Sequence, residues 1–179
     1  MVTLVEHLRA RALHTGGPFT LRSGAVTDWY VDARATTFDG TGASAAATAV
    51  LEVLDPAVTA VGGMTMGADP ISVATAVVGT AAGRTLRAFS IRKEAKGHGM
   101  GGRMVGPVTT DDVVAVLEDT TTTGGALIEA LEVLESEGIT VVQAIALVDR
   151  SGGVVAERVA ARGIPYVPLV LPADLGVEG

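Results

Sequence analysis

The sequence contains no cysteine, which excludes disulfide bonds and thiolate metal sites. Aromatic residues make up only 3% of the 179 residues although 48% of them are hydrophobic, so alanine, valine and leucine must build the core. The three histidines are scattered too widely for a zinc motif. No apolar run is long enough to span a bilayer, and charges interrupt the N-terminal apolar pattern, so no signal peptide is expected. These absences predict one soluble, cytoplasmic domain over residues 1–179 that does not bind a membrane.

Positive charge is also scarce, with 13 Lys and Arg against 20 Asp and Glu and a net charge of −7. This balance disfavours a nucleic-acid partner, because such proteins neutralise phosphates with basic residues. Only two of the 13 residues are lysines, Lys93 and Lys96, and both lie in the segment IRKEAKGHGMGGRM at 91–104. Genomic codon bias can explain why lysines are scarce, but it does not explain why both lie in the same short segment. A compact ammonium group on a glycine-rich loop suits a charged leaving group.

Hydrophobic periodicity predicts alternating strands and helices, which implies an α/β fold with a doubly wound parallel sheet. We expect helices over 2–13, 40–54, 69–82, 125–138 and up to 162, and strands over 19–21, 29–32, 58–61, 86–91, 113–117, 139–148 and 166–167. Asp69 and Pro70 are expected as N-cap and first residue of their helix, after a glycine turn over 62–67. His7 and His14 are expected on helix surfaces, and Met64 and Met66 in packing.

The stretch VVAVLEDTTTTGGA at 113–126 carries the most specific pattern in the chain. Its unbroken apolar run is typical of a strand buried on both faces of a sheet. Glu118 and Asp119 follow, and then four threonines and two glycines lead into a helical pattern. The free N–H groups and positive dipole end of a helix N-terminus bind phosphate, while the two carboxylates suit the hydroxyls of a phosphorylated sugar or its metal ion. The alternative is that the carboxylates only cap the helix.

Ligands of open parallel sheets bind beyond the carboxyl ends of the strands. The segments expected at such ends are 62–67, 92–103, 118–126 and 149–153, and we place the active site there. The glycines of the second segment make it mobile, as a closing lid would be, and His98 within it can donate a hydrogen bond to an anion. A solvated charged loop is the alternative. Arg150 offers a planar fork to a carboxylate, and a surface ion pair with Asp149 is its alternative.

Four segments together resemble the orotate branch of the type I phosphoribosyltransferase family. VVAVLEDTTTTGGA resembles the motif that binds phosphoribosyl pyrophosphate (PRPP), and FSIRKEAKGHGMGGRMVGP resembles the mobile catalytic loop of the orotate branch. FTLRSGAVTDWYVDAR and VGGMTMGADPI are similar to the hood and the pyrophosphate loop of that branch. The resemblance implies a Rossmann-like parallel sheet flanked by helices, with a small N-terminal hood over 1–38 and a core over 40–170.

The resemblance also implies a reaction in pyrimidine biosynthesis. PRPP and orotate give orotidine 5′-monophosphate and pyrophosphate, with Mg²⁺ bound mainly through PRPP and its pyrophosphate rather than by a metal site of the protein. The family is homodimeric, and its lid closes over the neighbouring subunit's site. A purine-base phosphoribosyltransferase and a non-catalytic PRPP-binding regulator are the alternatives.

Carried over by position, the resemblance assigns roles to particular residues. Glu118 and Asp119 hold the ribose hydroxyls. The 5′-phosphate is wrapped by Thr120, Thr121, Thr122, Thr123, Gly124, Gly125 and Ala126. Orotate contacts Thr122 and Arg150. The pyrophosphate is bound by Arg92, Lys93, Lys96 and His98. The residues expected to take part in catalysis are Lys96, His98 and Asp119.

The resemblance is incomplete at four positions, one of which is Arg22, at a hood position often held by lysine. Met66 stands where many members of the family carry a lysine that touches pyrophosphate, and Thr120 and Thr121 stand where aliphatic residues are usual. The contact made by that lysine is therefore absent or replaced in this chain.

Overall fold

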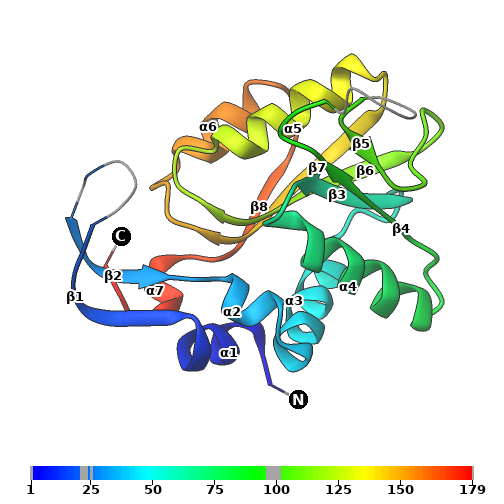
Figure 1. Ribbon diagram of the computed structural model, residues 1–179. Helices are drawn as coiled ribbons and strands as arrows, with labels where there is room; N and C mark the ends of the chain where they lie inside the picture. The colour runs from blue at the N-terminus through cyan, green and yellow to red at the C-terminus, as the bar shows by residue number, and fades with distance from the viewer. Residues whose placement is uncertain (1, 21–23, 25, 96–101, 179) are drawn as a thin grey trace.

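The computed structural model describes residues 2–20, 24, 26–95 and 102–178 (Figure 1). A six-stranded sheet has the order β5-β4-β3-β6-β7-β8, and β1 and β2 form a separate two-stranded sheet. The strands are β1 Leu13–Thr20, β2 Val26–Val31, β3 Ala60–Met64, β4 Arg87–Ile91, β5 Met104–Val105, β6 Val113–Thr121, β7 Thr140–Asp149 and β8 Tyr166–Val170. All neighbours in the large sheet are parallel except β5, which pairs antiparallel at its edge. The predicted α/β fold with a parallel sheet is confirmed.

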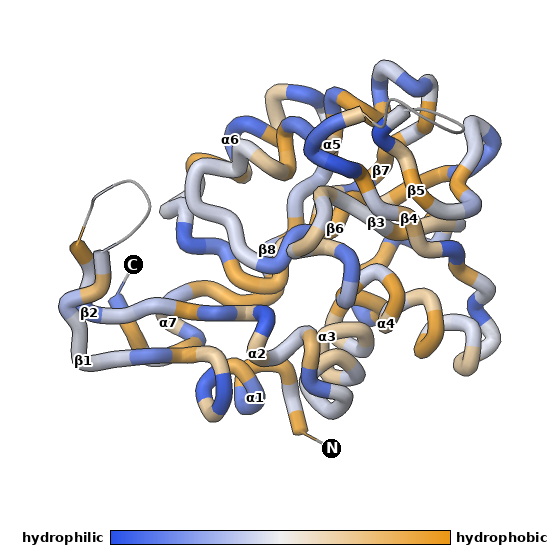
Figure 2. Tube along the Cα trace, in the orientation of Figure 1, coloured by the Kyte–Doolittle hydropathy of each residue, from blue (hydrophilic) through white to orange (hydrophobic). Residues whose placement is uncertain are grey.

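Helices cover both faces of the large sheet (Figure 1). The helices are α1 Leu4–Arg11, α2 Arg34–Thr37, α3 Gly40–Val53, α4 Ala68–Ala81, α5 Gly125–Ser136, α6 Val154–Ala160 and α7 Pro172–Leu175. One hydrophobic cluster joins α1, α3, α4 and α7 to the sheet, and a second joins α5 and α6 to its other face. Hydrophobic segments accordingly run through the sheet, and hydrophilic ones gather in outer turns (Figure 2). No helix of the described residues is long and apolar enough to cross a membrane.

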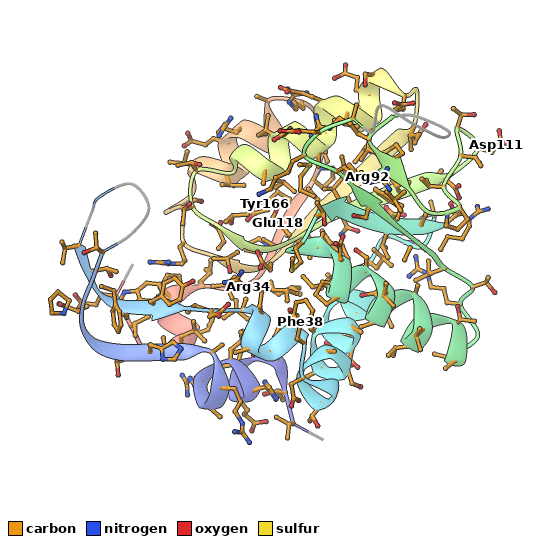
Figure 3. The ribbon with its side chains drawn as sticks, viewed as in Figure 1. Arg34, Phe38, Arg92, Asp111, Glu118 and Tyr166 are labelled. Carbon is orange, nitrogen blue, oxygen red and sulfur yellow. The ribbon has the colours of Figure 1, made fainter. Side chains whose placement is uncertain are left out.

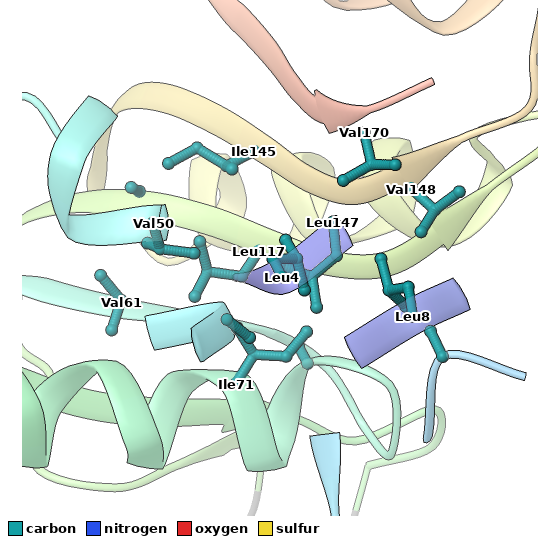
Figure 4. Packing of buried hydrophobic residues seen from close by; sticks show 14 of the residues in the cluster. Leu4, Leu8, Val50, Val61, Ile71, Leu117, Ile145, Leu147, Val148 and Val170 are labelled. Atoms are coloured by element: carbon teal, nitrogen blue, oxygen red, sulfur yellow. The ribbon is translucent and has the colours of Figure 1, made fainter. Parts of the chain in front are cut away.

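Strand β6 lies between the two clusters. Val114 and Val116 belong to the cluster of α5 and α6, whereas Ala115 and Leu117 belong to the other cluster. Figure 4 shows Leu117 within that second cluster, with Leu4 and Val50. This alternation confirms that the apolar run at 113–117 is a strand buried on both faces. The strand then continues through Glu118 and Asp119 to Thr121, four residues beyond the predicted end.

The predicted turn at 62–67 is wrong for its first three residues, because β3 includes Gly62, Gly63 and Met64. A Cβ atom on Gly62 would collide with the side chain and carbonyl oxygen of Phe89, and one on Gly63 with the backbone of Leu117. The glycines are therefore needed for close packing of neighbouring strands rather than for a turn.

The N-terminal elements also differ from the prediction. Strand β1 begins at Leu13, not at Phe19, and the register with β2 shifts between Thr15 and Phe19. That irregularity lets glycine and proline stay within a strand. The short helices α2 and α7 were not predicted, since four residues show no helical periodicity. The division into a hood over 1–38 and a core over 40–170 stays a prediction.

His7 is buried, so its predicted place on a helix surface is wrong. Its Nδ1 lies 3.1 Å from Thr36 Oγ1 and its Nε2 lies 3.1 Å from Asp39 Oδ1. Asp39 also caps α3 by accepting hydrogen bonds from the backbone N–H groups of Thr41 and Gly42. His7 therefore ties α1 to α2 and to the start of α3. His14 is exposed but lies in β1 rather than on a helix.

We expect Gly62→Ala to destabilise the protein by about 1–3 kcal/mol, because the added methyl group overpacks the contact with Phe89. Gly40→Ala is the matched control, since Gly40 opens α3 and a Cβ atom added to it would meet no other atom within 4 Å. Urea unfolding of both variants measures the difference. Equal stability of the two variants would contradict the role assigned to Gly62.

Candidate active site

A cavity of about 820 Å³ lies at the carboxyl ends of the parallel strands. Residues from 64–67, 118–126 and 150 line it, together with Lys93 from the segment after β4 and residues 30–34 from the end of β2 and the start of α2. The structure thus brings together parts of all four segments expected to form the site. It adds the segment 30–34, which sequence analysis did not include.

Glu118 and Asp119, the acid pair, stand at the edge of this cavity (Figure 3). Glu118 is only 7% exposed, and its Oε2 has no hydrogen-bond partner among the described residues. Burial, and then the neighbouring charge of Asp119, raise the pKa of Glu118 from 4.5 to about 8. The acid pair therefore holds a proton at neutral pH, so it can both donate to and accept from sugar hydroxyls.

The pyrophosphate loop approaches the acid pair through Gly67. A Cβ atom there would lie 2.8 Å from Glu118 Oε1 and 2.9 Å from Asp119 Oδ1, so only glycine fits. Gly67 is also the N-cap of α4, which corrects the predicted cap at Asp69. Asp69 instead accepts a hydrogen bond of 2.7 Å from the Thr65 hydroxyl. The peptide bond between Thr65 and Met66 is cis.

The turn over 120–126, here called the phosphate turn, leads from β6 into α5. Gly124 is the N-cap of α5 with φ +73° and no side-chain cap, so the alternative that the acid pair caps this helix is wrong. Thr120, Thr122, Thr123 and Ala126 line the cavity. The first backbone N–H groups of α5, including those of Gly125 and Ala126, lack partners within the helix and carry its positive dipole end.

Thr121 belongs to the segment expected to wrap the phosphate, but its side chain is buried and does not line the cavity. Its hydroxyl donates to Asp149 Oδ1 at 2.9 Å and lies 2.9 Å from the hydroxyl of Tyr166. Burial raises the pKa of Tyr166, which stays protonated. Asp149 also accepts from Ser151 N at 2.8 Å, and Arg150 N donates to Thr121 O at 2.8 Å. Thr121 therefore locks the phosphate turn to the residues on either side of Arg150.

Arg150 directly follows β7 and lies beside Trp29 of β2. Its guanidinium carbon lies 4.2 Å from the centre of the Trp29 ring. Its buried Nε has no hydrogen-bond partner in the described part of the chain, and burial lowers its pKa. Since Asp149 bonds to Thr121 and Ser151, the alternative of a surface ion pair between Asp149 and Arg150 is wrong. A buried donor without a partner requires an acceptor, and a ligand carboxylate would supply one.

The segment after β4 is only partly described. Lys93 lines the cavity, whereas Arg92 does not and instead donates its backbone N–H to Arg103 O at 2.8 Å. Lys96 and His98 lie outside the described residues. Met64 is 4% exposed, which confirms its packing role, but Met66 is 59% exposed, so its predicted packing role is wrong.

The chain is similar to known proteins in both sequence and structure, although no family model matches it. It is 40% identical over 176 residues to the orotate phosphoribosyltransferase of Streptomyces avermitilis, covering 98% of this chain and 96% of that protein. It is 44% identical over 163 residues to the orotate phosphoribosyltransferase of Corynebacterium glutamicum strain R, covering 90% of this chain and 86% of that protein.

Solved structures agree with this result. The orotate phosphoribosyltransferase of Mycobacterium tuberculosis H37Rv in complex with PRPP is similar, with a TM-score of 0.80, 32% identity and 97% of each chain covered. The orotate phosphoribosyltransferase of Aeropyrum pernix has a TM-score of 0.77 at 31% identity, over 99% of this chain and 100% of that chain. Adenine phosphoribosyltransferase of Leishmania donovani shares the fold, with a TM-score of 0.67 at 15% identity over 96% of this chain and 80% of that chain.

The parallel sheet, the acid pair at the end of β6 and the turn into α5 define a type I phosphoribosyltransferase. Within that class, the relatives cover nearly the whole chain at about 40% identity. The chain belongs to the orotate phosphoribosyltransferase family.

The raised pKa of Glu118 predicts a pH-dependent stability difference between the wild type and Glu118→Gln. In the unfolded chain the carboxyl ionises near 4.5, but the folded protein retains the proton up to about 8. Folding therefore becomes less favourable as pH rises between these values, by up to roughly 1.4 kcal/mol per pH unit, and the glutamine variant escapes this loss.

Thermal unfolding at several pH values measures the effect in the absence of ligand. The advantage of Glu118→Gln over the wild type should grow from about pH 5 to about pH 8 and then level off. The exposed Glu52 supplies a matched Glu→Gln control on α3. An advantage that shrinks as pH rises would contradict the assignment.

Proposed function

We propose that this chain transfers the 5-phosphoribosyl group of PRPP to orotate, giving orotidine 5′-monophosphate and pyrophosphate in pyrimidine biosynthesis. The observation that carries the proposal is the convergence of the acid pair, the N-terminus of α5 and the unpartnered Nε of Arg150 on one cavity. Each matches one part of the two substrates: the ribose, the 5′-phosphate and the orotate carboxylate.

Each part of the two substrates has its own position in the cavity. The 5′-phosphate binds to the phosphate turn, through the backbone N–H groups of α5 and the hydroxyls of Thr120, Thr122 and Thr123. Asp119 accepts from a ribose hydroxyl, while Glu118 holds the shared proton. Orotate lies between Thr122 and Arg150, with its carboxylate on the guanidinium fork.

The chemistry consists of exchanging the group on the anomeric carbon of ribose. The bond from this carbon to the pyrophosphate oxygen breaks as a ring nitrogen of orotate bonds to the carbon, so positive charge develops on the sugar and negative charge on the leaving group. Cationic side chains next to that group stabilise the transition state, each by about 3–4 kcal/mol, a value taken from the loss of one oxyanion-hole donor. Lys93, Arg92, Lys96 and His98 are proposed for this role, and closure of their segment excludes water.

Mg²⁺ is proposed to enter with PRPP. The described residues contain no group of three or more His, Cys, Asp or Glu side chains that could hold a metal ion. Hard oxygen donors suit Mg²⁺, and Asp119 beside the ribose site fits as its protein contact, with the other ligands supplied by PRPP and water. The ion supplies charge neutralisation on the diphosphate.

A homodimer is proposed on an exposed apolar face of α4. Met66, Val73 and Val77 are 59, 57 and 63% exposed. Val73 and Val77 are four residues apart and therefore lie on one side of α4, whereas Met66 precedes Gly67, the N-cap of this helix. Met66 also lines the cavity, so a partner on this face would bring its own lid next to the site. The cytoplasmic location expected from the sequence stays a prediction.

The reaction is tested by mixing the protein with PRPP, Mg²⁺ and orotate and following the loss of orotate absorbance. Arg150→Gln should raise the KM for orotate at least tenfold, because a charge-assisted hydrogen bond contributes about 1.5–3 kcal/mol, and should change the KM for PRPP much less. Arg150→Lys should recover only part of the loss, since it lacks the fork. Product formation from adenine, guanine or hypoxanthine instead of orotate would identify a purine enzyme.

The dimer is tested by Val73→Glu on the exposed face of α4. A buried glutamate charge would weaken the contact, so sedimentation should show a monomer at concentrations at which the wild type is dimeric. Val154→Glu is the matched control: Val154 is 50% exposed and opens α6 on the other face of the sheet, where a glutamate is tolerated. Two variants that sediment alike would refute this interface.

A further inference from the structure

The start of α2 places an arginine on the cavity wall that sequence analysis did not consider. Arg34 and Asp32 both line the cavity, on the side opposite the sheet. In Figure 3, Arg34 extends from α2 toward the end of β6 that carries Glu118. Gly67, also in the lining, touches the carboxylates of the acid pair from the pyrophosphate loop.

Arg34 is held by one nitrogen only. Its Nε donates to Asp32 Oδ1 at 2.9 Å, and the same oxygen accepts from the backbone N of Arg34 at 3.3 Å. The two Nη groups have no hydrogen bond to any described residue, and the side chain is 53% exposed. The fork is therefore oriented, while its two outer donors remain open to a ligand.

Contacts with α1 and with the residue before β1 also hold the segment that carries Arg34. Asp32 N donates to Ala12 O at 3.0 Å, and the buried His7 lies 3.1 Å from the hydroxyl of Thr36. These contacts join α2 to α1 and to the start of β1. A side chain on such a segment loses little further freedom when it binds a ligand.

Few cationic side chains of the described cavity lining are available for the diphosphate of PRPP. Three cationic side chains line the cavity in the described part of the chain: Arg34, Lys93 and Arg150. In the proposed function, the N-terminus of α5 binds the 5′-phosphate and Arg150 binds the orotate carboxylate. Met66 adds no charge to the pyrophosphate loop. Of the cations that line the cavity in the described part of the chain, Lys93 and Arg34 then remain for the diphosphate, in addition to Lys96 and His98, which lie outside the described residues.

The position of Arg34 also favours the diphosphate as its ligand. Arg34 and Asp119 line the same cavity, and the charge of Asp119 adds a smaller effect to that of Asp32 in raising the pKa of Arg34. The diphosphate is attached to the anomeric carbon, next to a ribose hydroxyl. A cation that shares the cavity with Asp119 is therefore a candidate partner for the diphosphate.

We infer that Arg34 is a ligand of the diphosphate group of PRPP and, after transfer, of the pyrophosphate product. This role rests on the proposed function. The Nη groups donate to non-bridging oxygens of the diphosphate while Nε stays on Asp32. As the bond to the anomeric carbon breaks and charge moves onto the leaving group, these hydrogen bonds strengthen, so Arg34 favours the transition state over the bound substrate.

The test compares two probes that each carry one half of PRPP. Inorganic pyrophosphate represents the diphosphate, and ribose 5-phosphate represents the remainder. Arg34→Gln should weaken binding of pyrophosphate with Mg²⁺ by roughly ten- to a hundredfold, as expected for loss of a charge-assisted hydrogen bond, and should leave ribose 5-phosphate within about twofold. Titration calorimetry measures both constants without turnover.

Two further variants separate this role from effects of net charge or folding. Arg11→Gln removes the same charge from the exposed end of α1, outside the cavity lining, and should change neither constant. Arg34→Lys keeps the charge and should recover part of the pyrophosphate affinity. In the steady state, Arg34→Gln should lower kcat with orotate and PRPP while the KM for orotate stays near the wild-type value.

The outcomes distinguish the inference from the function on which it rests. If the wild type converts orotate and Arg34→Gln binds pyrophosphate as tightly as the wild type, the role of Arg34 is wrong and the proposed function stands. An equal loss of affinity for both probes would also overturn it, because that pattern indicates a distorted cavity. If the wild type forms no product from orotate and PRPP, the proposed function fails and the inference fails with it.

Discussion

Burial of β6 on both faces of the sheet is the constraint on which the rest of the site depends. Alternate residues of the strand belong to two different hydrophobic clusters, so a shift of one residue would exchange their environments. The register is therefore well defined, and the acid pair and the phosphate turn emerge at one fixed place at the carboxyl edge. The raised pKa of Glu118 is a consequence, because the same burial limits the hydration of its charge.

Contacts between β2 and the large sheet complete the cavity. Arg150 at the end of β7 stacks on Trp29 of β2, so the proposed orotate contact depends on the position of β2. The hydroxyl of Thr121 binds Asp149 and contacts Tyr166, which ties the phosphate turn to the same residues that carry Arg150. The two proposed substrate positions are thus linked through one threonine, at a position where aliphatic residues are usual in the family.

Much of the fold and part of the site could be predicted because the patterns that specify them are local. The apolar run of β6, the glycines and threonines after it and the alternation of strands and helices all lie within short windows of sequence. The errors have a common cause in contacts between distant segments. Gly62 was assigned to a turn because its contact with Phe89 cannot be read from the local sequence. His7 was assigned to a helix surface because its contacts with Thr36 and Asp39 are equally distant in the sequence. Arg34 lies just past a strand, and nothing nearby in the sequence shows that it borders the cavity.

The sequence by itself determined the class of fold, the order of the elements and the presence of a sugar-phosphate motif after a buried strand, because these depend on residue periodicity and on local chemistry. Only the tertiary structure decided which side chains share the cavity and which face away from it. It turned Thr121 toward Asp149, left Nε of Arg150 without a partner among the described residues and brought Arg34 to the cavity. The reason is that these outcomes depend on how the hood packs against the carboxyl ends of the strands, and that packing joins residues more than a hundred positions apart in the chain.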